Sequence, residues 1–197
     1  MFTTVVDAIN DRLVPGERLL VGITGAPGAG KTTLAAKLAE FFEDAVVVPM
    51  DGFHLSNFEL GRLGFADRKG APFTFDVYGF AALLRRIRAA PAEIVYAPSF
   101  DHVLDEPIAG SVAVHPTTSI VITEGNYLLY WDSVRDLLDL TVHIDASPDE
   151  RLAGLIERQR AKGLDENAAR DWVFRSDEAN TRLVEEVADL ADLRLPR

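Results

Sequence analysis

The sequence contains no cysteine and no long apolar run. The absence of cysteine excludes disulfides and thiolate metal sites and fits a reducing compartment. The four histidines are scattered, so we expect no zinc site. No apolar run approaches the ~20 residues that cross a bilayer. The N-terminal stretch MFTTVVDAINDRLV carries acids in an amphipathic helix pattern, unlike a signal peptide. We therefore predict a soluble, cytoplasmic protein without a membrane partner.

The chain also has fewer basic than acidic residues. The chain has 20 Lys and Arg against 31 Asp and Glu, a formal net charge of -11. Nucleic-acid binding needs a basic surface that releases counterions, so we expect no nucleic-acid partner. Any anion site must then be a local pocket. With 197 residues, 48% of them hydrophobic, and no linker-like segment, the chain suits one compact domain over residues 1–197.

Short β-rich runs alternate with stretches of helical periodicity. Continuous apolar runs of this length are typical of strands buried on both faces, as in a parallel sheet covered by helices. The alternation predicts an α/β layered fold. We expect strands near 19–24, 45–50, 93–97, 119–124 and 140–144, and helices over 30–42, 76–90, 130–138, 148–161 and 165–188. Residues 52–75, rich in glycine, aromatics and charge, read as a long irregular connection, which is usually functional or disordered.

Residues 22–33 read GITGAPGAGKTT. Within them, Gly25–Thr32 match G-x-x-x-x-G-K-[ST], after a predicted strand and at the start of a predicted helix, as this phosphate-binding motif requires. Its glycines let successive backbone N–H groups point at phosphate oxygens, and the helix N-terminus adds partial positive charge. A plain glycine-rich turn with a surface lysine is the competing interpretation. A dinucleotide fold fits poorly, because the pattern is not G-x-G-x-x-G.

This motif predicts a three-layer P-loop NTPase fold with a mostly parallel five-stranded sheet. Lys31 is expected to reach the β- and γ-phosphates of ATP, and the Thr32 hydroxyl to ligate Mg²⁺. The residues expected to bind the nucleotide are Gly25, Ala26, Gly28, Ala29, Gly30, Lys31, Thr32 and Thr33.

Two acids follow predicted strands at the edge where the motif lies. Asp51 follows the run VVVPM, and ligands of parallel sheets gather at the carboxyl ends of the strands. A carboxylate there can accept a proton from an attacking hydroxyl, or orient it. The alternative is a turn-forming Asp-Gly pair. Glu124 ends the run IVITE, where an acid commonly holds Mg²⁺ directly or through water, although an aspartate is more usual there.

Five segments together resemble a known family. They are the phosphate loop, MDGFHLSN (50–57), RKGAPFTFDVYGF (68–80), APSFDH (97–102) and ITEGNYLL (122–129). They look like the P-loop kinases of the phosphoribulokinase, uridine kinase and bacterial pantothenate kinase group, over residues 20 to 180 or so. Within that group they are most similar to small bacterial nucleoside kinase-like proteins, some labelled fructose-transport kinases, and to a related yeast ATPase.

The resemblance favours Asp51 as general base over a turn residue. It implies that Arg68 and Lys69, with Asp76 after them, shape the acceptor side and that His102 lines it. A homodimer is common among the resembling proteins. From the residues alone, a basic turn at 68–70 and hydrogen-bonded structural roles for His54 and His102 remain open. The residues expected to contact the acceptor are Asp51, His54, Arg68, Lys69, His102, Asn126, Tyr127 and Asn180.

Residues 148–175 are expected to form a helical lid. Arginines of such a lid close over the phosphates and neutralise charge on the transferred group. Arg158 and Arg160 are the candidates, and the choice between them stays open. A plain exposed helix face carrying Arg151 and Arg158 is the alternative. Trp172 and Arg175 belong to WVFRSDEAN, a signature shared with the bacterial subgroup.

The function predicted from these features is transfer of the γ-phosphoryl group of ATP, with Mg²⁺, to an alcohol hydroxyl of a nucleoside, a pantothenate-like molecule or a sugar. The catalytic residues would be Asp51, Lys31 and the lid arginines. The alternative is a P-loop ATPase or nucleotide-dependent switch without a small-molecule acceptor. A GTPase would need an N-K-x-D guanine reader, which the sequence lacks. A nucleoside monophosphate kinase would want more arginines around the acceptor.

Overall fold

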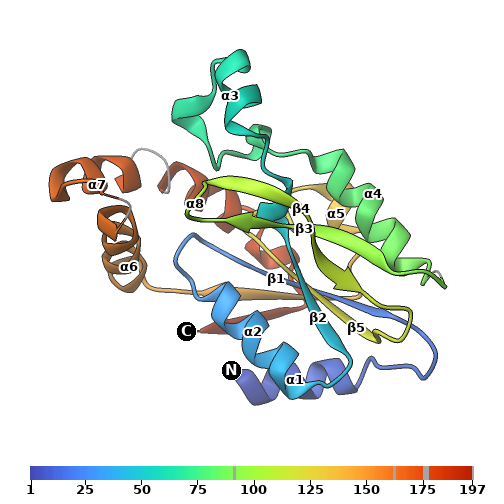
Figure 1. The fold of residues 1–197 in the computed structure, drawn as a ribbon. Coiled ribbons are helices and arrows are strands. Elements are labelled where there is room, and N and C mark those ends of the chain that lie inside the picture. The colour runs from blue at the N-terminus through green and yellow to red at the C-terminus, as the bar shows by residue number, and fades with distance from the viewer. Residues whose placement is uncertain (91, 162, 175–177, 197) are drawn as a thin grey trace.

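A parallel five-stranded sheet forms the middle layer of the molecule (Figure 1). The computed structural model describes residues 1–90, 92–161, 163–174 and 178–196. All neighbouring strands of this sheet run parallel, in the order β2-β5-β1-β6-β7. The strands are β1 (Leu19–Gly25), β2 (Ala45–Pro49), β5 (Ile120–Glu124), β6 (Leu140–Asp145) and β7 (Leu193–Pro196). Every residue of β1 and β5 is buried, as their continuous apolar runs predict.

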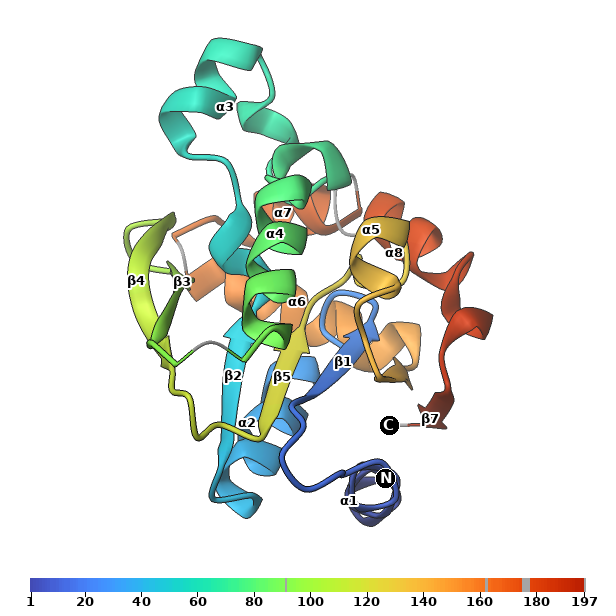
Figure 2. The same ribbon diagram turned by 90° about the vertical axis from the view of Figure 1, so that its right-hand side faces the viewer.

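Helices cover both faces of the sheet, which confirms the predicted α/β architecture (Figure 2). On one face, α1 (Phe2–Asn10) and α2 (Lys31–Phe41) bury Val5, Ile9, Leu34 and Leu38 against the sheet. The opposite face is covered by α4 (Val77–Arg88), α5 (Asp132–Arg135) and α8 (Glu178–Glu185). Because both faces are covered, the carboxyl ends of the strands are where a ligand is expected to bind.

The predicted strand 93–97 does not belong to this sheet. It lies in β3 (Val95–Asp101), which pairs with β4 (Glu106–Val114) as a separate antiparallel hairpin. The fifth strand of the main sheet is β7, which the sequence analysis missed together with β4. Both are hard to see in sequence, since β7 has four residues and β4 is exposed in its middle and contains proline and glycine.

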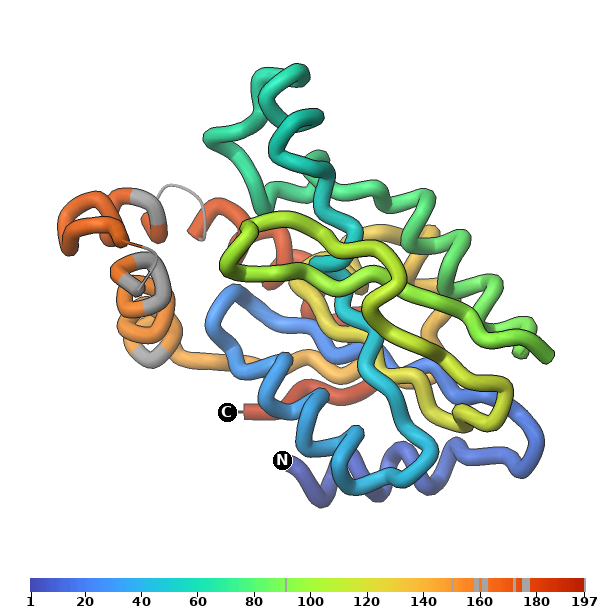
Figure 3. Tube along the Cα trace, in the orientation of Figure 1, coloured from blue at the N-terminus to red at the C-terminus, as the bar shows by residue number. Residues whose placement is uncertain are grey.

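The connection expected over residues 52–75 is ordered and projects from the body of the molecule (Figure 3). It contains α3 (Asn57–Leu63). Ser56 caps the start of this helix, since its hydroxyl accepts from the Glu59 N–H, and Gly64 caps its end. The 3₁₀ turns η1 (Met50–Phe53), η2 (Ala66–Arg68) and η3 (Pro72–Thr74) form the rest.

Two of the predicted helices differ from the structure. The stretch 165–188, predicted as one helix, contains α7 (Glu166–Trp172) and α8 as separate helices, followed by η5 (Ala188–Leu190). The stretch 130–138 contains only the short α5. The predicted helix 148–161 is confirmed as α6 (Pro148–Ala161), which lies beside α7 at one side of the molecule (Figure 1). Among the described residues, no helix has the length and apolar character to span a membrane.

Candidate active site

The phosphate-binding motif forms the turn between β1 and α2, at the carboxyl end of the sheet. Gly30 precedes the helix with φ at 93°, a left-handed conformation that side chains with a Cβ rarely adopt. The first residue of α2 is Lys31, so the free N–H groups of this helix face the turn. This arrangement is suited to an anion, because backbone donors and the helix dipole act at the same place.

The Lys31 side chain closes over this turn. It is buried, with 8% of its surface exposed. Its Nζ donates to the carbonyl oxygens of Gly25 and Ala26 at 2.9 and 3.0 Å, and to Oδ1 of Asn126 at 2.7 Å. Thr24 fixes the same segment after β5, because its hydroxyl donates to the carbonyl of Asn126 at 3.0 Å. The ammonium group is therefore held at the mouth of the phosphate loop.

Thr32 and Glu124 meet beside the lysine. The hydroxyl of Thr32 donates to Oε1 of Glu124 at 3.2 Å. Glu124 is 8% exposed and lies at the end of β5, in register with Ile23 of β1 and Pro49 of β2. A hydroxyl and a carboxylate supply the hard oxygen ligands that Mg²⁺ prefers. Their hydrogen bond brings two such oxygen ligands together, and Mg²⁺ binding by them stays a prediction.

Asp51 lies two residues beyond the Pro49–Glu124 pair, in the turn η1 that follows β2. Its side chain is 43% exposed, so the carboxylate is accessible to a ligand. The turn packs closely against the β3–β4 hairpin. A Cβ on Gly52 would lie 2.5 Å from the carbonyl oxygen of Pro98. Only glycine fits there, so the Asp-Gly pair is fixed by packing and also presents the carboxylate at the sheet edge.

His54 contacts the backbone of Asp51. Its Nδ1 lies 2.9 Å from the backbone carbonyl of Asp51 and 3.9 Å from Oδ1 of the same residue. The ring packs against Phe75 and Phe100, with centroid separations of 4.0 and 4.9 Å. Burial lowers the pKa of His54, and this effect outweighs the negative charge of Asp51. His54 is thus a largely buried imidazole whose neutral form is favoured.

Lys69 ties the projecting segment to the hairpin. Its Nζ donates to Oδ1 of Asn57 at 2.6 Å and to Oδ2 of Asp105 at 2.8 Å, and it also bonds the Asp105 carbonyl. It lies over the Phe100 ring at 5.1 Å. Lys69 is therefore a well-anchored cross-link. Its predicted contact with an acceptor stays a prediction.

The other two predicted basic residues on this side are exposed. Arg68 lies over the ring of Phe73 at 5.4 Å, and the ring of His102 is 5.3 Å from that of Phe100. Asp76, implied to shape the acceptor side, caps α4 by accepting from the Gly79 N–H. For Arg68 and His102, acceptor contact also stays a prediction.

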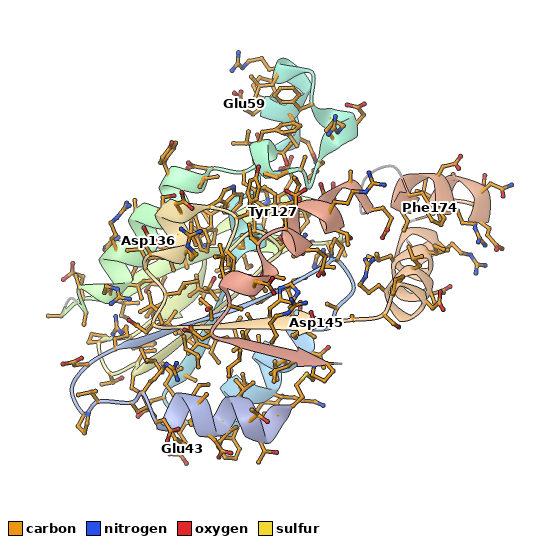
Figure 4. All side chains as sticks on the ribbon, turned by 180° about the vertical axis from the view of Figure 1, so that it is seen from behind. Glu43, Glu59, Tyr127, Asp136, Asp145 and Phe174 are labelled. Atoms are coloured by element: carbon orange, nitrogen blue, oxygen red, sulfur yellow. The ribbon has the colours of Figure 1, made fainter. Side chains whose placement is uncertain are left out.

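Tyr127 and Asn180 converge on one backbone carbonyl. The hydroxyl of Tyr127 donates to the Gly70 oxygen at 2.7 Å, and Nδ2 of Asn180 donates to the same atom at 3.1 Å. Both side chains are buried, Tyr127 completely, and Figure 4 shows Tyr127 inside the body of the molecule. They fix the loop at Gly70 between β5 and α8, and acceptor contact by either of them stays a prediction.

Arg151 is a site residue that sequence reasoning missed. It is 2% exposed, which rules out the exposed helix face considered for it. Its guanidinium donates to the Pro27 carbonyl of the phosphate loop at 3.1 Å, to Thr181 at 3.2 Å and to Glu178 at 2.8 Å. The signal that was available is its place in the first turn after β6, next to the strand that carries the phosphate loop.

The two arginines chosen from sequence lie further along α6. Arg160 is exposed and pairs with Glu157 of its own helix at 3.3 Å. The side chain of Arg158 lies outside what the structure describes, as do the side chain of Trp172 and the whole of Arg175. The contacts described here place Arg151 at the phosphate loop and do not bring Arg160 to it.

Comparison with known proteins adds to this geometry. Residues 20–197 match the profile described as the Phosphoribulokinase / Uridine kinase family. A Schizosaccharomyces pombe protein named "Putative uridine kinase" is 34% identical over 185 residues, covering 86% of this chain and 79% of that protein. A pantothenate kinase of Mycolicibacterium vanbaalenii is 32% identical over 145 residues, covering 69% of this chain and 45% of that enzyme.

A solved structure is similar over the full length. The crystal structure of a "putative fructose transport system kinase" from Silicibacter sp. TM1040 has a TM-score of 0.91 and 37% sequence identity. The match covers 100% of this chain and 99% of that one. The strand order, the phosphate loop and the segments predicted to face an acceptor therefore lie within a fold shared with that protein.

Proposed function

Because the chain belongs to the phosphoribulokinase and uridine kinase family, we propose that it is an ATP-dependent kinase that phosphorylates an alcohol hydroxyl of a small molecule. Relatives named for uridine, pantothenate and fructose suggest that the acceptor is a nucleoside, a pantothenate-like molecule or a sugar. The observation that carries the proposal is the position of Asp51, just beyond the Pro49–Glu124 pair at the edge of the sheet that holds the phosphate loop.

Each residue at this edge has a separate proposed task. The loop from Gly25 to Thr33 binds the phosphates through its N–H groups. Lys31 exchanges its bonds to the Gly25 and Ala26 carbonyls for phosphate oxygens, since those acceptors are neutral and the phosphates are charged. Thr32 and Glu124 hold Mg²⁺, which neutralises charge on the β- and γ-phosphates when bound.

Asp51 is the proposed general base. It takes the proton of the acceptor hydroxyl as that oxygen bonds to the γ-phosphorus, while the bond to the bridging oxygen breaks and ADP leaves. His54 holds the turn on which Asp51 lies, through the contact with the Asp51 carbonyl. Because the neutral form of His54 is favoured, the histidine adds little charge beside the base.

The acceptor is proposed to lie between η1, the β3–β4 hairpin and the Gly70 loop. Arg68, Lys69, His102 and Asn126 are proposed to contact it, and Tyr127 and Asn180 to shape it through Gly70. The segment 148–175 is proposed to act as a lid, with Arg158 or Arg160 reaching the phosphates on closure. A cytoplasmic location and a homodimer complete the proposal, supported by the cysteine-free sequence and by the family.

The test is a screen of ATP consumption with purified protein against nucleosides, pantothenate-like alcohols and sugars. We expect ADP release to rise strongly with one acceptor class and a phosphorylated product to form in equal amount. ATP consumption that no acceptor stimulates would favour the ATPase alternative. Product analysis separates the two, because an ATPase releases inorganic phosphate while a kinase transfers it.

A further inference from the structure

A histidine and two carboxylates meet next to β7, away from the proposed magnesium ligands. His143 and Asp145 belong to β6, and Glu185 is the last residue of α8. One ligand atom from each of these residues lies within 4.8 Å of the others. Asp145, labelled in Figure 4, is at the end of β6. The proposed magnesium ligands are Thr32 of α2, which covers the opposite face of the sheet from α8, and Glu124 at the end of β5.

The alternation of side chains along β6 explains how this cluster arises. Leu140, Val142 and Ile144 pack into the core beneath α1 and α2. The residues between them, Thr141 and His143, therefore point to the other face of the sheet. Thr141 is satisfied there, since its N–H and hydroxyl both bond Oδ2 of Asp192, at 2.7 and 2.8 Å. An inner strand of a covered sheet thus carries polar side chains on one face.

His143 is left without such a partner. Its side chain is completely buried, and neither ring nitrogen makes a hydrogen bond among the described residues. The two carboxylate oxygens paired with Nε2 are Oδ1 of Asp145 at 3.5 Å and Oε1 of Glu185 at 3.6 Å, longer than ordinary hydrogen bonds. A buried polar group without a protein partner is unfavourable, so its environment must supply one, as a bound ion or a water does.

These separations fit a metal ion better than direct hydrogen bonds. Ligand atoms at about 2.0–2.1 Å from a tetrahedral ion are roughly 3.3–3.4 Å apart. We propose that Nε2 of His143, one oxygen of Asp145 and one oxygen of Glu185 bind a divalent transition-metal ion of the Zn²⁺ type. One imidazole and two carboxylates are borderline ligands that suit Zn²⁺, and water completes the tetrahedron.

The charges around the cluster also favour a dication. Arg194 donates to Oδ1 of Asp145 at 2.7 Å and to Oδ1 of Asp189 at 2.5 Å. Three carboxylates, those of Asp145, Glu185 and Asp189, therefore face one guanidinium, which leaves two negative charges for a divalent ion to neutralise. Arg194 also fixes Asp145, as partners beyond the ligands do in metal sites.

A metal ion bound at this cluster would link α8 to the sheet. Glu185 ends a helix whose first residue, Glu178, binds Arg151 and whose Asn180 binds Gly70. An ion held by Glu185 and β6 would fix this helix relative to both the phosphate loop and the Gly70 loop. The site is thus structural in character and independent of the proposed phosphoryl transfer.

Metal binding to the nucleotide-free protein tests the proposal. Zn²⁺ is titrated by calorimetry in excess Mg²⁺, which keeps the Thr32–Glu124 site from contributing. Glu185→Gln removes one ligand charge at an exposed position with little change of shape. Glu186→Gln is the matched control, because Glu186 is the exposed neighbouring acid outside the cluster. Far-UV circular dichroism and the ATP-dependent shift in Tm check that both variants are folded.

We expect one Zn²⁺ per chain for the parent and for Glu186→Gln, and binding weaker by more than about tenfold for Glu185→Gln. Zn²⁺ should raise the Tm of the first two proteins only. Co²⁺ should give the parent the visible absorption of a tetrahedral ion, lost in Glu185→Gln. Equal Zn²⁺ binding by all three proteins, or no stoichiometric binding by the parent, would overturn the proposal. His143 would then be a buried imidazole whose Nε2 lies between two carboxylates without a metal ion.

Discussion

Lys31 donates a hydrogen bond from Nζ to Oδ1 of Asn126 across 2.7 Å, which joins the start of α2 to the segment after β5. The same ammonium bonds two carbonyls of the phosphate loop. A nucleotide would therefore find the lysine already positioned, and the three acceptors named here, two carbonyls and one amide, are neutral. This makes Lys31 the residue whose removal most directly separates nucleotide binding from the integrity of the fold.

Lys31→Ala should abolish most of the stabilisation by nucleotide. Saturating ATP with Mg²⁺ is expected to raise the Tm of the parent by about 5–10 °C, and that of the variant by a small fraction of this. Without nucleotide the variant should stay folded, with some loss of stability because the acceptors of three Lys31 hydrogen bonds lose this donor. Lys37→Ala, on the exposed side of the same helix, is the control and should respond like the parent. An undiminished ATP response of Lys31→Ala would contradict the assignment.

Glu124→Gln should weaken the use of Mg²⁺. The substitution keeps an oxygen near Thr32 but removes the charge that a divalent ion needs, so the Mg²⁺ concentration that gives half-maximal turnover should rise. The Tm shift caused by ATP without Mg²⁺ should change less than the shift with Mg²⁺. Glu40→Gln, an exposed acid on α2, serves as control. An unchanged Mg²⁺ requirement would remove Glu124 from the metal site.

The sequence alone predicts the parts of the fold that are built from continuous apolar runs. The predicted ends of β1, β5 and β6 lie within one residue of the observed ends. β1 and β5 are mostly apolar, as strands buried on both faces are, and β6 is apolar at every second residue, with Thr141 and His143 between. β7 could not be found in this way, since it has two leucines in four residues and is a strand only because β6 lies beside it.

The candidate site likewise contains residues that the sequence predicts and residues that it does not. Lys31 and Thr32 belong to a local motif with fixed spacing, so sequence places them. Arg151 reaches the Pro27 carbonyl across 124 positions of the chain, and the Tyr127–Gly70 bond spans 57. Such contacts depend on how helices dock onto the sheet, which residue spacing does not record. The His143 cluster could not be predicted for the same reason, because its members come from β6 and α8.

Arg151→Ala should destabilise the protein far more than Arg160→Ala. Removing the buried guanidinium leaves the Pro27 carbonyl and Glu178 without their partner, which should cost about 3 kcal/mol and lower Tm by roughly 6–12 °C. Arg160 is exposed and pairs with Glu157 of its own helix, so its loss should change stability by less than about 0.5 kcal/mol. Thermal unfolding measures both, and equal effects would show that Arg151 is not the anchor described here.

His54 should make the protein less stable in mild acid. Burial lowers the pKa of the folded-state imidazole, while Lys69 lowers it further and Asp51 and Asp105 act against this. The unfolded chain therefore binds the proton more readily, so the free energy of unfolding falls as pH drops below about 6.5 and levels off below the lowered pKa.

His54→Asn tests this relationship. Its amide can still donate to the Asp51 carbonyl but does not titrate. The variant should be less stable overall, because the contacts with Phe75 and Phe100 are lost. Its stability should nevertheless change less than that of the parent between pH 7 and pH 5, measured by urea unfolding. An identical pH dependence would mean that His54 titrates alike in the folded and unfolded states.

Asp51→Asn should separate phosphoryl transfer from nucleotide binding. The amide keeps the size of the side chain but cannot accept the acceptor's proton, so turnover with the acceptor found in the screen should fall by roughly 10²–10⁴-fold. The ATP-dependent Tm shift should match the parent's, because Lys31, Thr32 and Glu124 are untouched. Slow hydrolysis of ATP without acceptor should continue near the parent's rate.

Asp67→Asn, at an exposed acid in η2, controls for the loss of one charge from the same segment. Loss of nucleotide binding together with turnover would assign Asp51 to the metal ion instead, and unchanged turnover would make it a turn residue of the Asp-Gly pair.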